Sequence, residues 1–124
     1  MVGRLRVLFL AGCFVLASAA AYAMVNPFGP TGLPLTQDDI AAMAAAVDPL
    51  LNDDTTPIGT SRDWNNDKSG NHGSIKLLQR FQHKYNGSDL TCRKLQYTFD
   101  IKNEADPYKM SIDRCLVDGK WKFL

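Results

Sequence analysis

The sequence predicts an α+β fold, in which one N-terminal amphipathic helix packs on a four-stranded antiparallel β-meander that carries one disulfide. An alanine-rich segment that ends at Pro49 has apolar residues at helical spacing. After Gly73, apolar and polar residues alternate with a period of two, which is typical of strands with one buried face. Cys92 and Cys115 lie within the alternating segments and form the predicted disulfide.

Residues 1–23 have the pattern of a secretory signal peptide. A start with two arginines is followed by a largely apolar run over residues 7–19, and Ala21-Tyr22-Ala23 supplies the small residues that signal peptidase requires. The apolar run is shorter than the roughly 20 residues of a membrane-spanning helix. We therefore predict export, cleavage after Ala23 and no transmembrane span in the mature chain.

Cys13 leaves a second interpretation of this leader open. Leu10-Ala11-Gly12-Cys13 fits the lipobox of bacterial lipoproteins, in which the cysteine is acylated and becomes the new N-terminus. The residues after Cys13 stay apolar, whereas a lipoprotein normally becomes polar there. This favours removal of Cys13 with the leader.

A domain over residues 35–124 is expected to follow a flexible tether. The tether, residues 24–34, is rich in glycine and proline. Thr36 suits the N-cap of the helix, because its side chain accepts hydrogen bonds from the first turn. Ile40, Met43, Ala44 and Val47 then form one apolar stripe. Pro49 stops or kinks the helix, since it lacks an N–H group, although Leu50 and Leu51 could add one more turn on the same side.

Residues 53–73 predict a polar loop with Trp64 as its one large apolar anchor. Four strands of a meander follow, each defined by alternating apolar side chains. In chain order these are Ile75, Leu77, Phe81 and Tyr85; Leu95, Tyr97, Phe99 and Ile101; Tyr108, Met110, Ile112 and Leu116; and Trp121 with Phe123.

A four-residue turn at 102–105 fixes the register of the two central strands. It sets Leu95 opposite Ile112, with the neighbouring apolar residues also paired on one face. The same register sets Cys92 opposite Cys115 on the other face, where Cα atoms lie about 4.5–5.5 Å apart and a disulfide fits. In the last hairpin, Asp118-Gly119 predicts a type I′ turn.

No motif predicts catalysis, a cofactor or a bound metal. Residues 63–70 resemble the first half of an EF-hand calcium loop, but Lys68 stands where glycine is needed and Ser74 where a bidentate glutamate is needed. His72 and His83 have no cysteine or histidine at metal-binding spacing. Nucleophile-elbow and paired-carboxylate signatures are absent from the sequence. The protein is therefore predicted not to be an enzyme.

The outer face of the predicted sheet is the first candidate binding surface. Its basic residues are Lys76, Arg80, Lys84, Lys94, Lys109, Lys120 and Lys122. Such a face attracts an anionic envelope component, such as lipid head groups or lipopolysaccharide, or an acidic envelope protein. It is also explained by lysines that keep exposed strands from aggregating. Nucleic acid is not expected as a partner, because loss of two arginines with the leader leaves 12 basic against 13 acidic residues.

Arg93 and Arg114 project onto the apolar face, where opposed like charges repel. Either a bulge turns Arg93 away or an acidic residue pairs with the arginines, and Arg114 is also within reach of Phe123 for stacking. Together with Trp64 and Asn66, the two arginines form the second candidate binding element.

Several short motifs extend over residues 35–123. They are an alanine-rich helix after Leu35–Asp39, Trp64-x-Asn66, Ser69-Gly70, Gly73, Cys92-Arg93, Cys115 and Asp118-Gly119-x-Trp121. In these motifs the chain resembles the 17-kDa surface-antigen-like domain of Gram-negative envelope proteins. The resemblance implies a non-catalytic envelope protein, located in the periplasm or associated with the outer membrane or cell surface.

Two functional hypotheses follow. The first is a structural or interaction module of the envelope that docks through the basic face. The second is an accessory or inhibitor protein that binds a soluble envelope enzyme through the loop around Trp64.

Overall fold

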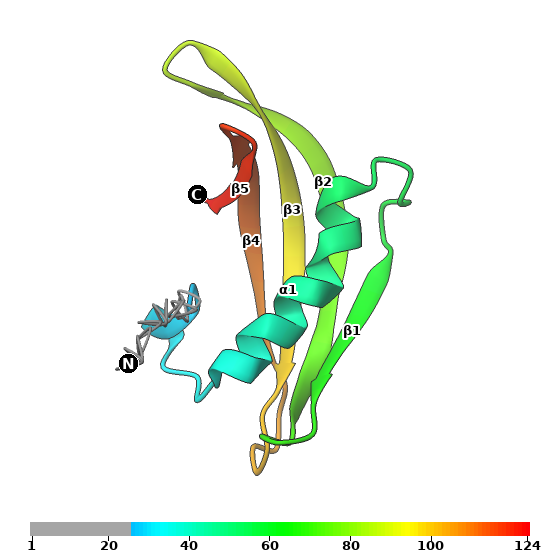
Figure 1. Cartoon of the computed structure of the whole chain (residues 1–124), viewed down its shortest axis with the longest axis vertical. Helices are drawn as coiled ribbons and strands as arrows, with labels where there is room; N and C mark the ends of the chain where they lie inside the picture. Colours follow the sequence, from blue (N-terminus) through cyan, green and yellow to red (C-terminus); the bar gives the residue numbers. More distant parts are fainter. Residues whose placement is uncertain (1–25) are drawn as a thin grey trace, which may run out of the picture.

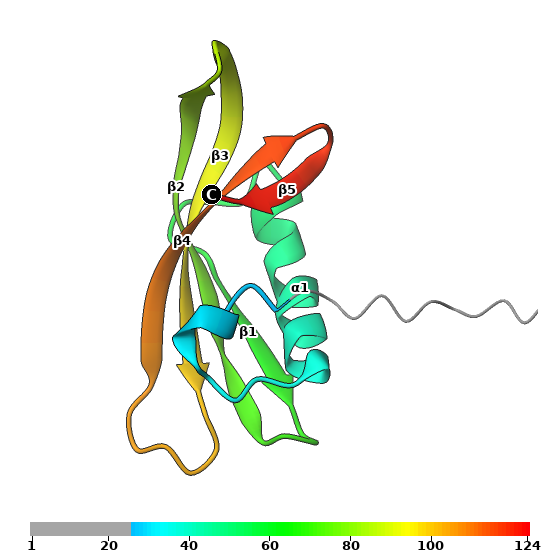
Figure 2. The ribbon, with the colours of Figure 1, turned by 90° about the vertical axis from the view of Figure 1, so that its left-hand side faces the viewer.

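The computed structural model describes residues 26–124, in which one helix lies across one face of a curved antiparallel sheet (Figures 1 and 2). The elements are the 3₁₀ helix η1 (Gly29–Thr31), α1 (Gln37–Asn52), β1 (Ser61–Asn66), β2 (Asn71–Tyr85), β3 (Ser88–Asp100), β4 (Tyr108–Val117) and β5 (Lys120–Phe123). Each strand pairs with the next, in the order β1-β2-β3-β4-β5. The α+β class, the meander and the disulfide are confirmed. The predicted leader, including Cys13, lies outside the described residues.

The sheet has five strands rather than the predicted four, and β1 is the additional one. It lies within residues 53–73, for which the sequence analysis wrongly predicted a loop throughout. Only Trp64 and Asn66 of β1 are buried, and its other residues are exposed. Because one of the two buried residues is polar, the strand lacks the apolar alternation by which the other strands are recognised.

Helix α1 begins as predicted at a Thr36 cap. The Thr36 hydroxyl accepts a hydrogen bond from the Asp39 N–H at 3.1 Å, and the Asp39 carboxylate accepts one from the Thr36 N–H at 2.9 Å. This reciprocal capping box satisfies two N–H groups at the helix start. Pro49 does not end the helix: Leu50 and Leu51 add a last turn and are both buried.

The segment before the helix is packed against the domain, so the predicted tether is corrected for its described part. Phe28 is only 2 % exposed, and its ring centroid lies 5.1 Å from that of Tyr97 and 5.0 Å from that of Phe99. A single aromatic residue among glycines and prolines forms no periodic pattern. The sequence therefore gives little sign that this segment is anchored.

The predicted register of β3, β4 and β5 is confirmed. Leu95 lies opposite Ile112, Cys92 opposite Cys115, and the two cysteines form the disulfide with a Cα–Cα distance of 4.1 Å. The Asp118-Gly119 turn has φ angles of 51° and 76°, as a type I′ turn requires.

A β-bulge in β2 moves two basic residues to the other face of the sheet. Leu77 lies opposite Leu95, but Gln79 lies opposite Lys94, so Leu78 is an extra residue on β2. An extra residue inverts the alternation of everything that follows it. Arg80 and Lys84 therefore lie on the helix side, and their prediction for the outer face is wrong.

Gly73 allows the Trp64 side chain to lie close to the sheet. Trp64 is opposite Gly73 in the β1–β2 ladder and is only 3 % exposed. A Cβ atom at Gly73 would collide with the carbonyl oxygen of Thr98 and would lie 2.8 Å from the Trp64 Nε1 atom. Glycine is therefore required where the indole crosses β2.

Candidate functional site

Three arginines lie side by side across the helix-facing side of the sheet. Arg80 is opposite Arg93, and Arg93 is opposite Arg114, with Phe123 next on β5. We call Arg80, Arg93 and Arg114 the arginine row. The bulge in β2 creates it, because without the bulge Arg80 would face outward. Like charges directly opposed across strands are destabilising, so the row needs an electrostatic explanation.

Arg93 pairs with an acidic residue. This is one of the two alternatives that the sequence left open, the other being a bulge that turns Arg93 away. It is 5 % exposed, and its guanidinium lies 2.8 Å from the carboxylate of Asp54, just beyond the end of α1. The guanidinium also lies 5.3 Å from the ring centroid of Trp121. Arg93 therefore stays on the inner face, with its guanidinium over the Trp121 ring.

The other two members of the row have no acidic partner among residues 26–124. Arg80 donates to the backbone carbonyls of Asp53 and Thr56. Arg114 lies 4.5 Å from the Phe123 ring centroid, which confirms the expected stacking, and donates to the Trp121 carbonyl at 3.4 Å. The described part of the row thus combines three cations with one carboxylate.

Strand β5 bends toward the C-terminal end of α1 (Figure 2). The Trp121 indole N–H donates to the Asn52 side-chain oxygen at 2.8 Å, which ties the strand to the last turn of the helix. Trp121 and Phe123 thereby hold aromatic rings beside Arg93 and Arg114 respectively. The sequence analysis placed both arginines correctly on this face.

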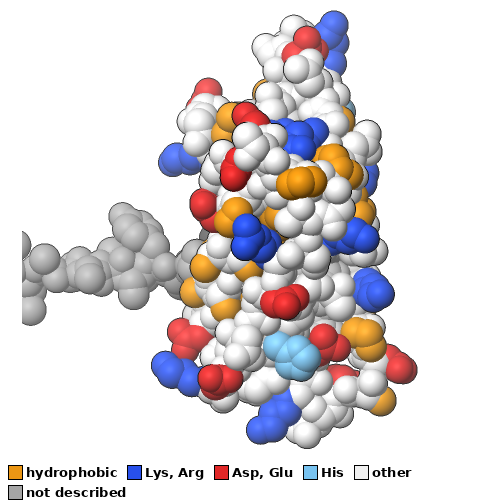
Figure 3. Space-filling model, turned by 90° about the vertical axis from the view of Figure 1, so that its right-hand side faces the viewer, with side chains coloured by type: hydrophobic (Ala, Val, Ile, Leu, Met, Phe, Trp, Pro, Cys, Tyr) orange, Lys and Arg blue, Asp and Glu red, His pale blue; other side chains and the backbone are white. Residues whose placement is uncertain are grey.

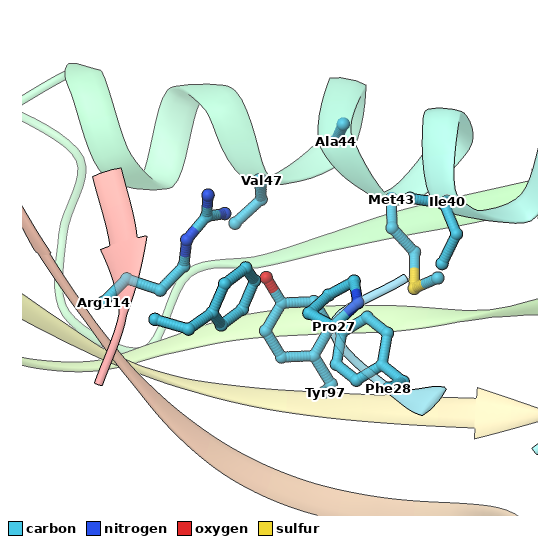
Figure 4. A pocket seen from close by; sticks show the side chains of 9 residues that line it. Pro27, Phe28, Ile40, Met43, Ala44, Val47, Tyr97 and Arg114 are labelled. Atoms are coloured by element: carbon cyan, nitrogen blue, oxygen red, sulfur yellow. The ribbon is translucent and has the colours of Figure 1, made fainter. Parts of the chain in front are cut away.

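An apolar pocket of about 260 Å³ lies beside Arg114, between the helix, the sheet and the segment before the helix (Figure 4). Its lining residues are Pro27, Phe28, Ile40, Met43, Ala44, Val47, Tyr97, Arg114 and Phe123. Burial raises the pKa of the Tyr97 hydroxyl, although the charge of Arg114 acts in the opposite direction. Tyr97 is therefore a neutral polar group in a pocket with one cationic end.

The sequence analysis did not find this pocket. It assigned the apolar stripe of the helix and the strand residue Tyr97 to the hydrophobic core. Most of each of these side chains is indeed buried there. The pocket arises only where α1, β5 and the segment carrying Phe28 meet. The signal that could have pointed to it was the placement of Arg114 on an apolar face.

The outer face keeps five of its seven predicted basic residues. These are Lys76, Lys94, Lys109, Lys120 and Lys122, and the same face carries Asp63, Asp100 and Asp113. Lys94 is paired with Asp113 at 2.9 Å. Figure 3, which shows the molecule from the side of β1, likewise has basic and acidic side chains interspersed. The face is moderately basic rather than a continuous positive field.

Trp64 and Asn66 do not form an exposed binding loop, which corrects the second candidate element. Both side chains are buried in β1, at 3 % and 9 % exposure. The Asn66 amide donates to the Asp39 carboxylate at 2.8 Å, near the start of α1, whereas Arg93 pairs with Asp54 beyond its end. The four candidate residues are therefore not brought together, and the enzyme-binding hypothesis loses its binding element.

Asp39 forms the most densely hydrogen-bonded polar centre of the described chain, a role that the sequence analysis did not predict. The side chain is fully buried. Besides the Thr36 N–H and Asn66, its carboxylate accepts from the Ser69 hydroxyl at 2.6 Å and the Asn71 amide at 2.8 Å. These bonds join the start of α1 to the β1–β2 turn, so the role of Asp39 is structural.

The segment that resembles half a calcium loop forms part of β1 and the turn into β2. Its Ser69 hydroxyl is engaged with Asp39. Within residues 26–124, no three histidine, cysteine or acidic side chains are grouped to hold a metal ion. In the same range, no helix has the length and apolar character to cross a membrane.

Comparison with known proteins identifies no relative of this chain. No protein-family model matches the chain, and neither a curated protein nor a solved structure matches it.

Proposed function

We propose that this protein is an exported, non-catalytic interaction module of the cell envelope, located in the periplasm or at the outer membrane or cell surface. The observation that carries the proposal is the disulfide between Cys92 and Cys115, which joins β3 to β4 with both cysteines fully buried. Disulfides of this kind persist in oxidising compartments. The signal-peptide pattern of residues 1–23 supports the same compartment, and the resemblance to surface-antigen-like domains supports the envelope and a role without catalysis.

The interaction surface in this proposal is the outer face of the sheet. Helix α1 covers the opposite face, as Figure 2 shows. Among the outer lysines, Lys76, Lys109, Lys120 and Lys122 are exposed and have no acidic partner within the described chain. Exposed lysines near a negatively charged surface contribute about 1 kcal/mol each. The partner that fits is an anionic lipid surface, bound weakly and in a salt-dependent way.

The purified protein is expected to co-sediment with phosphatidylglycerol vesicles at low salt and to be released as salt screens the lysines. Changing Lys109, Lys120 and Lys122 together to glutamine should weaken this binding on the order of a hundredfold, because three contributions are lost. The matched control changes Lys68, Lys84 and Lys102 to glutamine, which removes the same charge elsewhere. Equal retention on phosphatidylcholine vesicles, or an equal loss in the control, would contradict docking through this face.

A further inference from the structure

The charge of Arg114 is not balanced by the protein that the structure describes. Within the described chain, the carboxylate at ion-pair distance from the arginine row belongs to Asp54, and it is engaged by Arg93. The Arg114 Nε atom is buried and has no hydrogen-bond partner. A buried donor without an acceptor is costly, and Arg93 directly opposite adds repulsion. An anion beside Arg114 would relieve both effects.

The space next to Arg114 is small and mostly apolar. In Figure 4 the Arg114 side chain lies at one end of the pocket, and Ile40 and Met43 of α1 lie toward the other. The volume of about 260 Å³ is slightly below the range of drug-sized sites, roughly 300–1,000 Å³. A slender chain fits this space better than a bulky ring system or a two-chain lipid. Phe123, 40 % exposed, leaves one wall of the pocket accessible from solvent.

The ligand that suits these features of the pocket is an amphipathic anion with a single unbranched tail. A guanidinium pairs with a carboxylate through two parallel hydrogen bonds. The tail would contact the same side chains that form the apolar stripe of α1. We propose that the pocket binds a medium-chain carboxylic acid, with its carboxylate at Arg114 and its alkyl chain between α1 and Phe28. Tyr97, whose hydroxyl keeps its proton, supplies a second polar contact at the cationic end.

The proposal goes beyond docking to a lipid surface and can fail independently of it. The pocket lies on the helix side of the sheet, whereas the lysines of the docking face lie on the other side. If the protein bound vesicles but not the carboxylic acid, the proposed envelope function would stand and only the proposed ligand would be wrong. If it bound the carboxylic acid but not vesicles, only the proposed docking surface would be wrong.

The test is a titration of the purified protein, with its disulfide intact, against decanoate below its micelle-forming concentration. The methyl resonances of Ile40 and Met43 should shift in a saturable way, while that of Ile58, exposed in the loop before β1, should not. Decanol has the tail without the charge, and butyrate has the charge with little tail. Both should bind at least tenfold more weakly than decanoate. Equal binding of decanol, or shifts that never saturate, would overturn the proposal.

Two pairs of variants locate the binding. Arg114→Gln should weaken decanoate binding by at least tenfold and leave decanol unchanged, whereas Arg80→Gln, in the same row but outside the pocket, should change it less than twofold. Ala44→Leu should abolish binding by filling the pocket while Arg114 stays in place. Ala45→Leu, at the neighbouring exposed position of α1, is its matched control. Undiminished binding in Ala44→Leu, or an equal loss in its control, would contradict the assigned site.

Discussion

Replacing Cys92 with serine is expected to lower the thermal midpoint by on the order of 10 °C or more. The disulfide closes a segment with a sequence separation of 23 residues. In the chain-entropy model, that closure removes about 3.4 kcal/mol of denatured-state entropy. A domain of this size has a total stability of about 5–10 kcal/mol. The bond is thus a large share of the stability, and Cys92→Ser also buries a hydroxyl where the sulfur is fully enclosed.

The double variant Cys92→Ser/Cys115→Ser should be no less stable than the single one. The single variant already lacks the disulfide, so the entropic stabilisation that the bond provides cannot be lost a second time. Thermal unfolding followed by far-ultraviolet circular dichroism measures both. Reduction of the wild-type protein should reproduce most of the shift. A melting curve unchanged by reduction would contradict the structural role of the bond.

Replacing Asp39 with alanine is expected to lower the free energy of unfolding by about 3 kcal/mol or more, since each buried donor left without an acceptor costs about 1–3 kcal/mol. The affected donors are the Thr36 N–H, the Asn66 and Asn71 amides and the Ser69 hydroxyl. The matched control is Asp38→Ala in the same helical turn. Asp38 is exposed and its ion pair with Lys68 is on the surface, so a loss of less than about 1 kcal/mol is expected. Denaturant titration measures both variants, and equal losses would contradict the account.

The Asp39 contribution should also depend on pH. Burial alone would raise the pKa of the carboxyl, but hydrogen bonds from Ser69, the Thr36 N–H, Asn71 and Asn66 together hold it below the ordinary value of 3.8. A pKa lowered by folding gives stability that is fully present above the unfolded-state value and is lost as pH falls through the folded-state value. The stability difference between wild type and Asp39→Asn should therefore shrink below roughly pH 4. A difference that does not change with pH would show that the carboxylate is not selectively stabilised.

The C-terminal three strands could be predicted in detail because independent signals agree there. Apolar alternation sets Leu95 opposite Ile112, and the same register brings Cys92 to Cys115. The Asp-Gly turn then fixes the last hairpin, since two successive positive φ angles suit few other residue pairs. A shift of one residue would have broken all three relations at once.

The remaining errors come from residues whose role depends on tertiary contacts. Leu77 and Leu78 are both apolar, so the sequence does not show which of them is the extra residue of the bulge. Without the bulge, Arg80 cannot be placed beside Arg93. In β1, the inward position of Asn66 is explained only by its hydrogen bond to Asp39, 27 residues earlier. Phe28 likewise becomes recognisable as a core residue only through its contact with Tyr97.

The charge asymmetry of the chain has a partial structural explanation. Residues 24–67 hold most of the acidic excess, and residues 68–124 most of the basic excess. Asp54 and Asp38 from the first part pair with Arg93 and Lys68 from the second. Arg80 and Arg114 have no such acidic partner in the described chain, so the arginine row keeps unpaired positive charge.

Intact-mass analysis of the protein isolated from its own cells, before and after reduction, tests the central claim most directly. The account predicts an unmodified N-terminus at Met24, with Cys92 and Cys115 joined until reductant is added. An acylated chain beginning at Cys13 would contradict cleavage after Ala23. A chain that retains residues 1–23 and has free thiols at Cys92 and Cys115 would contradict export itself.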